Sequence, residues 1–172
     1  MLTIDFLGDS ITEGAGSNGP DTIYSAVCCR LIGAIEKNYG VSGTRIARQR
    51  VIDMAGDPDE DFILRARWMD RNADFLFVFG GTNDFGHGDA PLGQMGDKTP
   101  FTFYGAMNIL CSDLLRYGFK KDRICFIVPT RRFDEDSLVG DGSKRRDTSL
   151  TQYWMTTLRR RKRYALITRL IH

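Results

Sequence analysis

The chain has 172 residues, of which 42% are hydrophobic and 27% are charged, and its formal net charge is +2. This length is enough for one domain with a buried core and too short for two, so we predict a single domain over residues 1–172. The composition is that of an ordinary soluble globular protein, and no apolar run reaches the ~20 residues that a membrane-spanning helix needs.

Strand-like and helix-like segments alternate along the chain. The predicted elements are, in order, the strand Leu2–Leu7, the helix Thr22–Ile35, the strand Ala34–Tyr39, the helix Asp59–Met69, the strand Asp74–Phe79, the helix Phe101–Tyr117, the strand Arg123–Val128, the helix Thr148–Arg163 and the strand Tyr164–Ile171. A long loop is expected from Gly80 to Pro100. This alternation predicts a parallel sheet with helices on both faces.

Apolar spacing supports the helices in this series. The first helix has a stripe of residues spaced by four, at Ile23, Val27 and Leu31. The helix Phe101–Tyr117 has residues spaced by four, three and four, at Phe103, Met107, Leu110 and Leu114. Each spacing keeps the side chains on one face of a helix, which is the face expected to pack on the sheet.

Three short turns that could carry chemistry follow three separate strands. Ser10 follows the first strand, Gly43 the second and Asn83 the third. The loops at the carboxyl ends of parallel strands share one edge, where ligands bind. An acyl-transfer serine enzyme needs a nucleophile and donors for an oxyanion, which these residues could supply together. Taken singly, they are more typical of a helix cap, a turn glycine and a loop asparagine.

The sequence resembles the SGNH (GDSL) hydrolases in three blocks that occur in the family's order. They are Gly8-Asp9-Ser10, Asn38-Tyr39-Gly40-Val41-Ser42-Gly43 and Gly80-Gly81-Thr82-Asn83-Asp84. The likeness covers roughly residues 1–150. It implies an α/β fold, a three-layer α/β/α sandwich with a five-stranded parallel sheet of flavodoxin-like type.

The resemblance also implies an activity and a set of roles. Members hydrolyse carboxylic esters, thioesters and carbohydrate acetyl groups without a metal, so we expect a small-molecule ester substrate and neither cofactor nor metal. By this resemblance Ser10 is the nucleophile, and its amide, the Gly43 amide and the Asn83 side chain form the oxyanion hole. Asp9, Asp84 and His87 are expected to line the substrate site.

The fourth part of the family pattern, an Asp-x-x-His that supplies the base, does not occur after the last predicted strand. No acidic residue follows Asp147, and the only histidine beyond it is His172. The abrupt change to an atypical basic segment at 153–172 suggests a truncation or a change of reading frame near residues 153–160. We therefore expect an esterase that works through an acyl-enzyme at Ser10 but is impaired.

Two histidines are candidate substitutes for the base. His87 completes Asp84-Phe85-Gly86-His87, which has the Asp-x-x-His spacing, although Asp84 already belongs to the asparagine block. His172 follows the last predicted strand and could reach Ser10, although a chain terminus is usually frayed. If neither acts, the oxyanion hole and substrate binding alone leave roughly 10³–10⁴-fold catalysis over water.

Two other functions compete with an esterase. The first is a non-catalytic protein that keeps the pocket to bind an acyl group or a small anion. The second is a flavodoxin-like nucleotide-binding domain with Gly8–Gly16 around a phosphate. The chain lacks Gly-Lys-Ser/Thr and Gly-x-Gly-x-x-Gly, and Asp9 and Glu13 would repel phosphate, which argues against the second.

Charge and cysteine usage bear on partners and location. Six of the 24 basic residues and none of the 22 acidic residues lie in 159–172, so the rest of the chain has a net charge of −4. The basic run has no interleaved glycines or aromatic residues, so we expect a solvated helix end and no nucleic-acid or membrane partner.

The four cysteines lie in apolar elements, which is typical of reduced thiols in a cytoplasmic protein. The first strand begins almost at Met1, so we expect no signal peptide. A homodimer through exposed apolar sheet is a further expectation.

Overall fold

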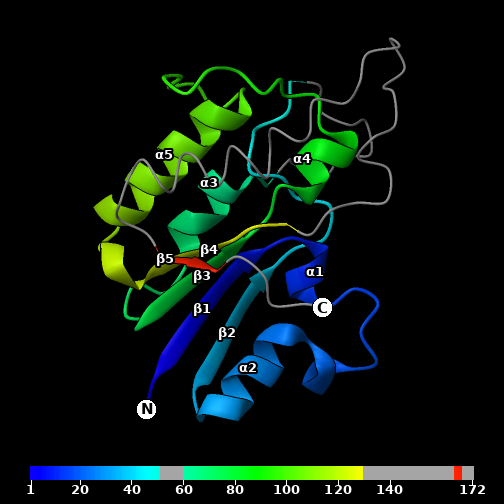
Figure 1. The fold of residues 1–172 in the computed structure, drawn as a ribbon, viewed down its shortest axis with the longest axis vertical. Helices are drawn as coiled ribbons and strands as arrows, with labels where there is room; N and C mark the ends of the chain where they lie inside the picture. The colour runs from blue at the N-terminus through cyan, green and yellow to red at the C-terminus, as the bar shows by residue number, and fades with distance from the viewer. Residues whose placement is uncertain (51–59, 130–164, 168–172) are drawn as a thin grey trace.

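The computed structural model describes residues 1–50, 60–129 and 165–167. Within this part of the chain, five parallel strands form one sheet in the order β2-β1-β3-β4-β5 (Figure 1). The strands are β1 (Thr3–Gly8), β2 (Ile35–Gly40), β3 (Phe75–Phe79), β4 (Ile124–Ile127) and β5 (Ala165–Ile167). This arrangement confirms the predicted fold class.

The strand order changes direction between β1 and β3. β1 pairs on one side with β2, from Thr3 opposite Ile35 to Gly8 opposite Gly40, and on the other side with β3. In open parallel sheets, ligands bind beyond the carboxyl ends of the strands at such a switch point. The loops that follow β1, β2 and β3 therefore lie where a site is expected.

Helices cover both faces of the sheet (Figure 1). The α-helices are α1 (Ser10–Glu13), α2 (Tyr24–Ile32), α3 (Phe62–Arg65), α4 (Thr82–His87) and α5 (Phe103–Arg116). The 3₁₀ turns are η1 (Pro20–Thr22), η2 (Ala66–Trp68) and η3 (Lys121–Arg123). Figure 1 shows α2 on one side of the strands and α3 and α5 on the other.

The core is divided by the alternation of side chains along β1. Ile4 and Phe6 pack with Cys29 of α2 in the smaller cluster. Leu7 belongs to the larger cluster, which is built on α3, α5 and the central strands. Successive residues of a strand point to opposite faces, so β1 supplies both clusters.

The apolar stripe predicted for α5 is confirmed, because all four of its residues are buried: Phe103, Met107, Leu110 and Leu114. The stripe predicted for the first helix is wrong. Leu31 is 79% exposed, and the buried residues of α2 are Ser25 and Cys29. The ring of Tyr24 also meets the sheet, edge to face with Phe6 and Phe79, so this side of α2 combines small side chains with an aromatic one.

Two further predictions need correction. The segment Gly80–Pro100 is not a continuous loop, because α4 occupies Thr82–His87 directly after β3. The helix predicted over Asp59–Met69 is a short α3 followed by the 3₁₀ turn η2. Met69 is extended (ψ 152°), which ends the turn.

The last predicted strand is confirmed for Ala165–Ile167, which pairs in parallel with β4 from Cys125 to Ile127. Outside the described residues lie the rest of Tyr164–Ile171, the helix predicted over Thr148–Arg163, and His172.

All four cysteines are free, and Cys29, Cys111 and Cys125 are buried. In the described ranges no helix is both long and apolar enough to cross a membrane.

Candidate functional site

Ser10 is the first residue of α1 and follows β1 after a single residue, Asp9. The Asp9 side chain caps the helix by accepting a hydrogen bond from the Ile11 amide at 3.0 Å. Asp9 is buried, and this burial raises the pKa of its carboxyl. A Cβ at Gly8 would overlap the Thr12 hydroxyl. The turn that presents Ser10 is therefore fixed by a cap and by close packing.

The loop after β2, which carries Gly43, is bonded to both β1 and α1. The Val41 amide donates to the Gly8 carbonyl at 3.1 Å. The Ser42 amide donates to the Glu13 carboxylate at 2.8 Å, and the Ser42 hydroxyl donates to the same oxygen. Gly43 has φ +77°, a left-handed conformation that favours glycine. The serine turn and the glycine loop thus form one connected unit.

Gly40 marks the closest approach of these two segments. A Cβ on Gly40 would overlap the Glu13 amide nitrogen and lie 2.5 Å from the Thr12 carbonyl carbon. These are backbone atoms of α1, which cannot move aside as a flexible side chain could. Only glycine therefore allows the loop after β2 to pack on α1 at this distance.

Replacing Gly40 with alanine is expected to lower the free energy of unfolding by about 1–3 kcal/mol, the usual cost of overpacking. Urea unfolding monitored by circular dichroism measures this change. Gly96→Ala is the matched control, because a Cβ there meets nothing within 4 Å. Equal stability of the Gly40→Ala and Gly96→Ala variants would contradict the close packing of α1 on this loop.

Asn83 is the second residue of α4 and is 8% exposed. Its side-chain Nδ2 donates to the Thr44 carbonyl at 3.0 Å, one residue beyond Gly43. The asparagine block is therefore joined directly to the glycine loop. Since that loop is bonded to the segment around Ser10, the structure brings the loops that carry Ser10, Gly43 and Asn83 together.

The Asp84 carboxylate anchors the same loop further along. It accepts hydrogen bonds from the Ile46 amide at 2.9 Å and the Ala47 amide at 2.8 Å. Burial raises the pKa of Asp84 to about 6, although these two bonds and the nearby Arg45 act in the opposite direction. The Asp84 carboxylate thus binds backbone amides of the loop after Gly43. His87 ends α4, and only its backbone is described.

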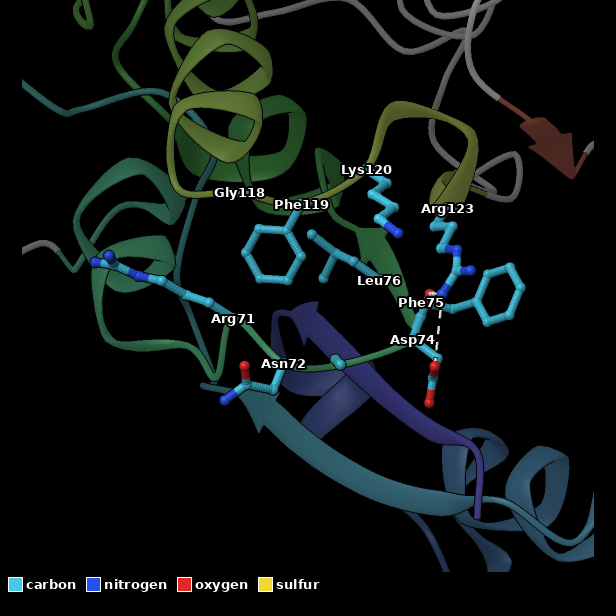
Figure 2. Close-up of a pocket in the computed structure, with 10 residues that line it drawn as sticks. Arg71, Asn72, Asp74, Phe75, Leu76, Gly118, Phe119, Lys120 and Arg123 are labelled. Carbon is cyan, nitrogen blue, oxygen red and sulfur yellow. Dashed lines mark hydrogen bonds and ion pairs between the residues drawn. The ribbon is translucent and has the colours of Figure 1, made fainter.

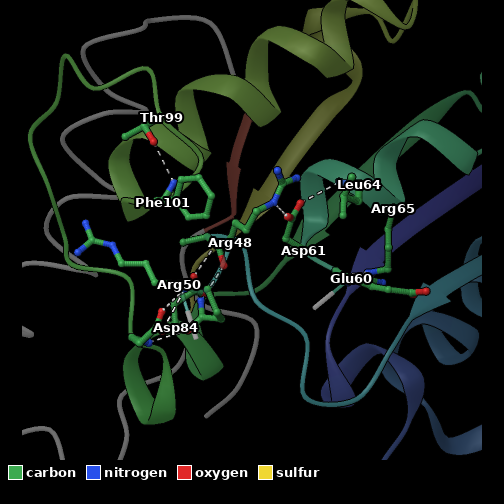
Figure 3. Close-up of polar contacts among 12 residues, drawn as sticks. Arg48, Arg50, Glu60, Asp61, Leu64, Arg65, Asp84, Thr99 and Phe101 are labelled. Atoms are coloured by element: carbon green, nitrogen blue, oxygen red, sulfur yellow. Dashed lines mark hydrogen bonds and ion pairs between the residues drawn. The ribbon is translucent and has the colours of Figure 1, made fainter. Parts of the chain in front are cut away.

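Asp61 and Arg48 connect this loop to α3 (Figure 3). The Asp61 side chain caps α3 by accepting from the Leu64 amide at 2.9 Å, and it accepts from Arg48 Nε at 2.7 Å. Asp61 is fully buried, so its carboxylate is shielded from solvent in this ion pair. The segment Thr44–Arg48 is therefore held by α3 as well as by α4.

Sequence reasoning missed Arg65, a buried arginine of α3 that bonds to the ends of both β1 and β2. The available signal was a charged residue inside the run Phe62-Ile63-Leu64-Arg65-Ala66, where every neighbour is apolar. A buried charge is retained only when specific partners hold it, so such a residue indicates a polar network.

A separate cavity of about 180 Å³ lies away from these loops (Figure 2). Its lining includes Arg71, Asn72, Asp74, Phe119, Lys120 and Arg123. Asp74 and Arg123 immediately precede β3 and β4, so the cavity lies at the amino ends of these strands. Ser10 lies at the opposite edge of the sheet, and the cavity is therefore not part of the candidate site. Among the described residues, no group of three or more His, Cys, Asp and Glu is arranged to hold a metal ion.

Known proteins resemble this chain in sequence and in fold. A profile of the GDSL-like lipase/acylhydrolase family matches residues 6–121, which include all three loops. A solved protein from Lactobacillus plantarum is 30% identical, with a TM-score of 0.63 over 91% of this chain and 72% of its own. No curated protein matches the chain.

Two more distant structures share the fold. The esterase AlinE4, of the SGNH-hydrolase family, is 18% identical with a TM-score of 0.62, over 96% of this chain and 75% of its own. A possible lipase from Chitinophaga pinensis is 20% identical with a TM-score of 0.67, over 96% of this chain and 66% of its own. At these identities the likeness bears on the fold alone.

Proposed function

The chain belongs to the GDSL-like lipase/acylhydrolase family, and we propose that it hydrolyses a carboxylic ester of a small molecule through an acyl-enzyme at Ser10. The observation that carries this proposal is the set of hydrogen bonds that joins the three loops. Val41 N donates to Gly8 O, and Asn83 Nδ2 donates to Thr44 O. The nucleophile block is thereby tied to the two segments that would supply oxyanion donors.

The proposed reaction has two halves. The Ser10 oxygen attacks the ester carbonyl carbon, and the amides of Ser10 and Gly43 and the Asn83 side chain stabilise the resulting oxyanion. The carbon–oxygen bond to the alcohol then breaks, the alcohol leaves with the proton that the Ser10 hydroxyl loses, and Ser10 keeps the acyl group. Water attacks the acyl-enzyme in the same way and releases the carboxylic acid. Asp9 and Asp84 contribute by holding the turn and the loop, since both carboxylates accept from backbone amides.

The base is the weak part of this machinery. Residues 1–172 contain two histidines, His87 and His172. The Asp84 carboxylate, which would have to orient His87, accepts hydrogen bonds from the amides of Ile46 and Ala47. We therefore propose that Ser10 works without an efficient base and that turnover depends mainly on the oxyanion hole.

A fluorophosphonate probe tests the nucleophile. We expect a single adduct, which mass spectrometry of a digest should place on the peptide that contains Ser10. Ser10→Ala should abolish the adduct. Ser42→Ala is the control and should keep it, because Ser42 lies in the same region and its hydroxyl donates a hydrogen bond to the Glu13 carboxylate. An adduct on Ser42, or labelling that survives Ser10→Ala, would rule out Ser10 as the nucleophile.

Hydrolysis of p-nitrophenyl acetate tests the base. We expect slow release of p-nitrophenol, and we expect His87→Ala and His172→Ala each to retain the rate within about threefold. A hundredfold loss in either variant would identify that histidine as the base and would refute the proposal of base-poor catalysis. Absence of both labelling and hydrolysis would favour the alternative function, a non-catalytic acyl or small-anion binder on the same scaffold.

A further inference from the structure

We propose that Arg65 is a positioning residue that holds the serine turn and the glycine loop in a fixed relative position. This inference rests on the proposed function for its catalytic meaning, but the contacts that support it belong to the fold. Arg65 is the last residue of α3 and is only 7% exposed. A buried guanidinium needs hydrogen-bond acceptors inside the protein for its N–H groups, and the positions of these acceptors indicate its role.

The donors of Arg65 reach four residues, three through a backbone carbonyl and one through a side-chain hydroxyl. Nη2 donates to the Gly8 carbonyl at 2.9 Å and to the Thr44 hydroxyl at 2.8 Å. Nη1 donates to the Tyr39 carbonyl at 2.6 Å, and Nε donates to the Glu60 carbonyl at 3.0 Å. Figure 3 shows Arg65 beside Glu60, with its side chain directed toward the end of β1.

Three of these partners are close in sequence to the residues proposed to bind the oxyanion. Gly8 ends β1 and lies two residues before Ser10, whereas Tyr39 is the penultimate residue of β2. Thr44 follows Gly43 directly, its hydroxyl donates to Val41 O at 2.7 Å, and its carbonyl accepts from Asn83. A single guanidinium therefore contacts the segment before the nucleophile and the segment that carries the glycine amide.

The sheet alone does not account for this arrangement. The ladder between β1 and β2 ends at the pair Gly8 and Gly40. Ser10 and Gly43 both lie beyond that point, so strand pairing does not fix the distance between their amides. Arg65 bonds to the last residues of the ladder and, through Thr44, to the loop beyond it. It thus extends the rigid part of the fold up to the residues proposed to bind the oxyanion.

The charge of Arg65 is maintained at neutral pH in this setting. Burial lowers the pKa of Arg65 to about 10, against the attraction of Glu60, Asp9 and Asp61. The Phe62 ring lies against the guanidinium, with 4.8 Å between Arg65 Cζ and the ring centroid. Lysine cannot reproduce the planar set of donors, since its ammonium is a point charge on a flexible stem. Arg65→Lys is therefore the sharpest variant, because it keeps the charge and removes the geometry.

Hydrogen exchange of the wild type and Arg65→Lys tests the positioning role without requiring turnover. We expect the amides of residues 8–14 and 40–47 to exchange at least about tenfold faster in the variant, while those of α5 keep their rates. Arg67→Lys is the matched control, because Arg67 is an exposed arginine two residues further on. Unchanged exchange in both loops, or a uniform increase that includes α5, would overturn the proposal.

Kinetics separate positioning from a general effect on stability. In Arg65→Lys, kcat should fall by about 10²-fold, the loss that a displacement near 1 Å produces, whereas KM should stay within about threefold. Added guanidinium should restore part of the rate to Arg65→Ala, provided that variant folds. A rate equal to the wild type, measured well below the melting temperature of Arg65→Lys, would contradict the role. If the wild type hydrolyses no ester, the proposed function fails, and the exchange experiment still decides the role of Arg65.

Discussion

Replacing Asn83 with alanine is expected to lower kcat for p-nitrophenyl acetate by about 10²–10³, the typical effect of losing one oxyanion donor. Asn83 is 8% exposed, and its Nδ2 lies 3.0 Å from the Thr44 carbonyl, so its amide group is held next to the glycine loop. A donor that acts on charge formed in the transition state should change kcat and leave KM nearly constant.

The same substitution removes the hydrogen bond to Thr44, so its structural effect has to be measured separately. The loss of that bond should lower the free energy of unfolding by only about 1 kcal/mol. Asn108→Ala is the control, because the Asn108 side chain also donates to backbone carbonyls, those of Met95 and Asp97, but from α5. A kcat within threefold of the wild type, or a loss confined to KM, would exclude Asn83 as an oxyanion donor.

Replacing Asp5 with asparagine is expected to stabilise the protein by about 2–4 kcal/mol at pH 8. Asp5 lies in β1 and is fully buried, and neither carboxyl oxygen has a hydrogen-bond partner among the described residues. The pKa of Asp5 is raised to about 7, mainly by burial and to a smaller extent by the nearby Asp70, while Lys37 opposes the shift. The folded protein therefore has to release this proton against a penalty that the unfolded chain does not meet.

The sign of the pH dependence follows from the two pKa values. The pKa rises from 3.8 in the unfolded chain to about 7 in the folded protein, so between these values the unfolded state binds fewer protons. The contribution of Asp5 to stability should therefore be fully present near pH 4, decrease as the pH rises to about 7, and remain constant above. The advantage of Asp5→Asn over the wild type should grow across this range and be small at pH 4.

Urea unfolding of the wild type and Asp5→Asn at pH 4.5 and pH 8 measures this difference. Asp122→Asn is the control, because the Asp122 side chain lies exposed in η3. An Asp5→Asn variant that gains nothing at pH 8 would show that the folded protein accommodates the Asp5 charge, for example through the nearby Lys37.

Local patterns in the sequence predicted the sheet and the positions of the candidate residues. Apolar runs predicted β1, β3 and β4 to within about one residue at each end, because strands that pack on both faces leave a continuous apolar signal. The spacing of Phe103, Met107, Leu110 and Leu114 indicated the buried face of α5 correctly. Ser10, Gly43 and Asn83 were found because each follows a strand, and this relation is local in the chain.

The contacts between the loops could not be predicted in this way. Asp84 bonds to amides 38 and 37 residues before it, and Arg65 bonds to Gly8 across 57 residues. No periodicity records such partners, since they depend on how the loops meet in space. The face of α2 was also misjudged, because Ser25 and Cys29 carry a weaker hydrophobic signal than the exposed Leu31. The polar network around the site is thus the part of the structure that could not be predicted from the sequence.

The sheet order has a consequence for how the protein is made. The strands that carry the three loops, β1, β2 and β3, are adjacent in the sheet and all lie within the first 79 residues, whereas β4 and β5 extend one side later. Translation proceeds at roughly 5–20 residues per second, so a ribosome delivers Asn83 several seconds before it delivers β5. The nascent chain can therefore align the three loops of the candidate site with one another while the far edge of the sheet is still being synthesised.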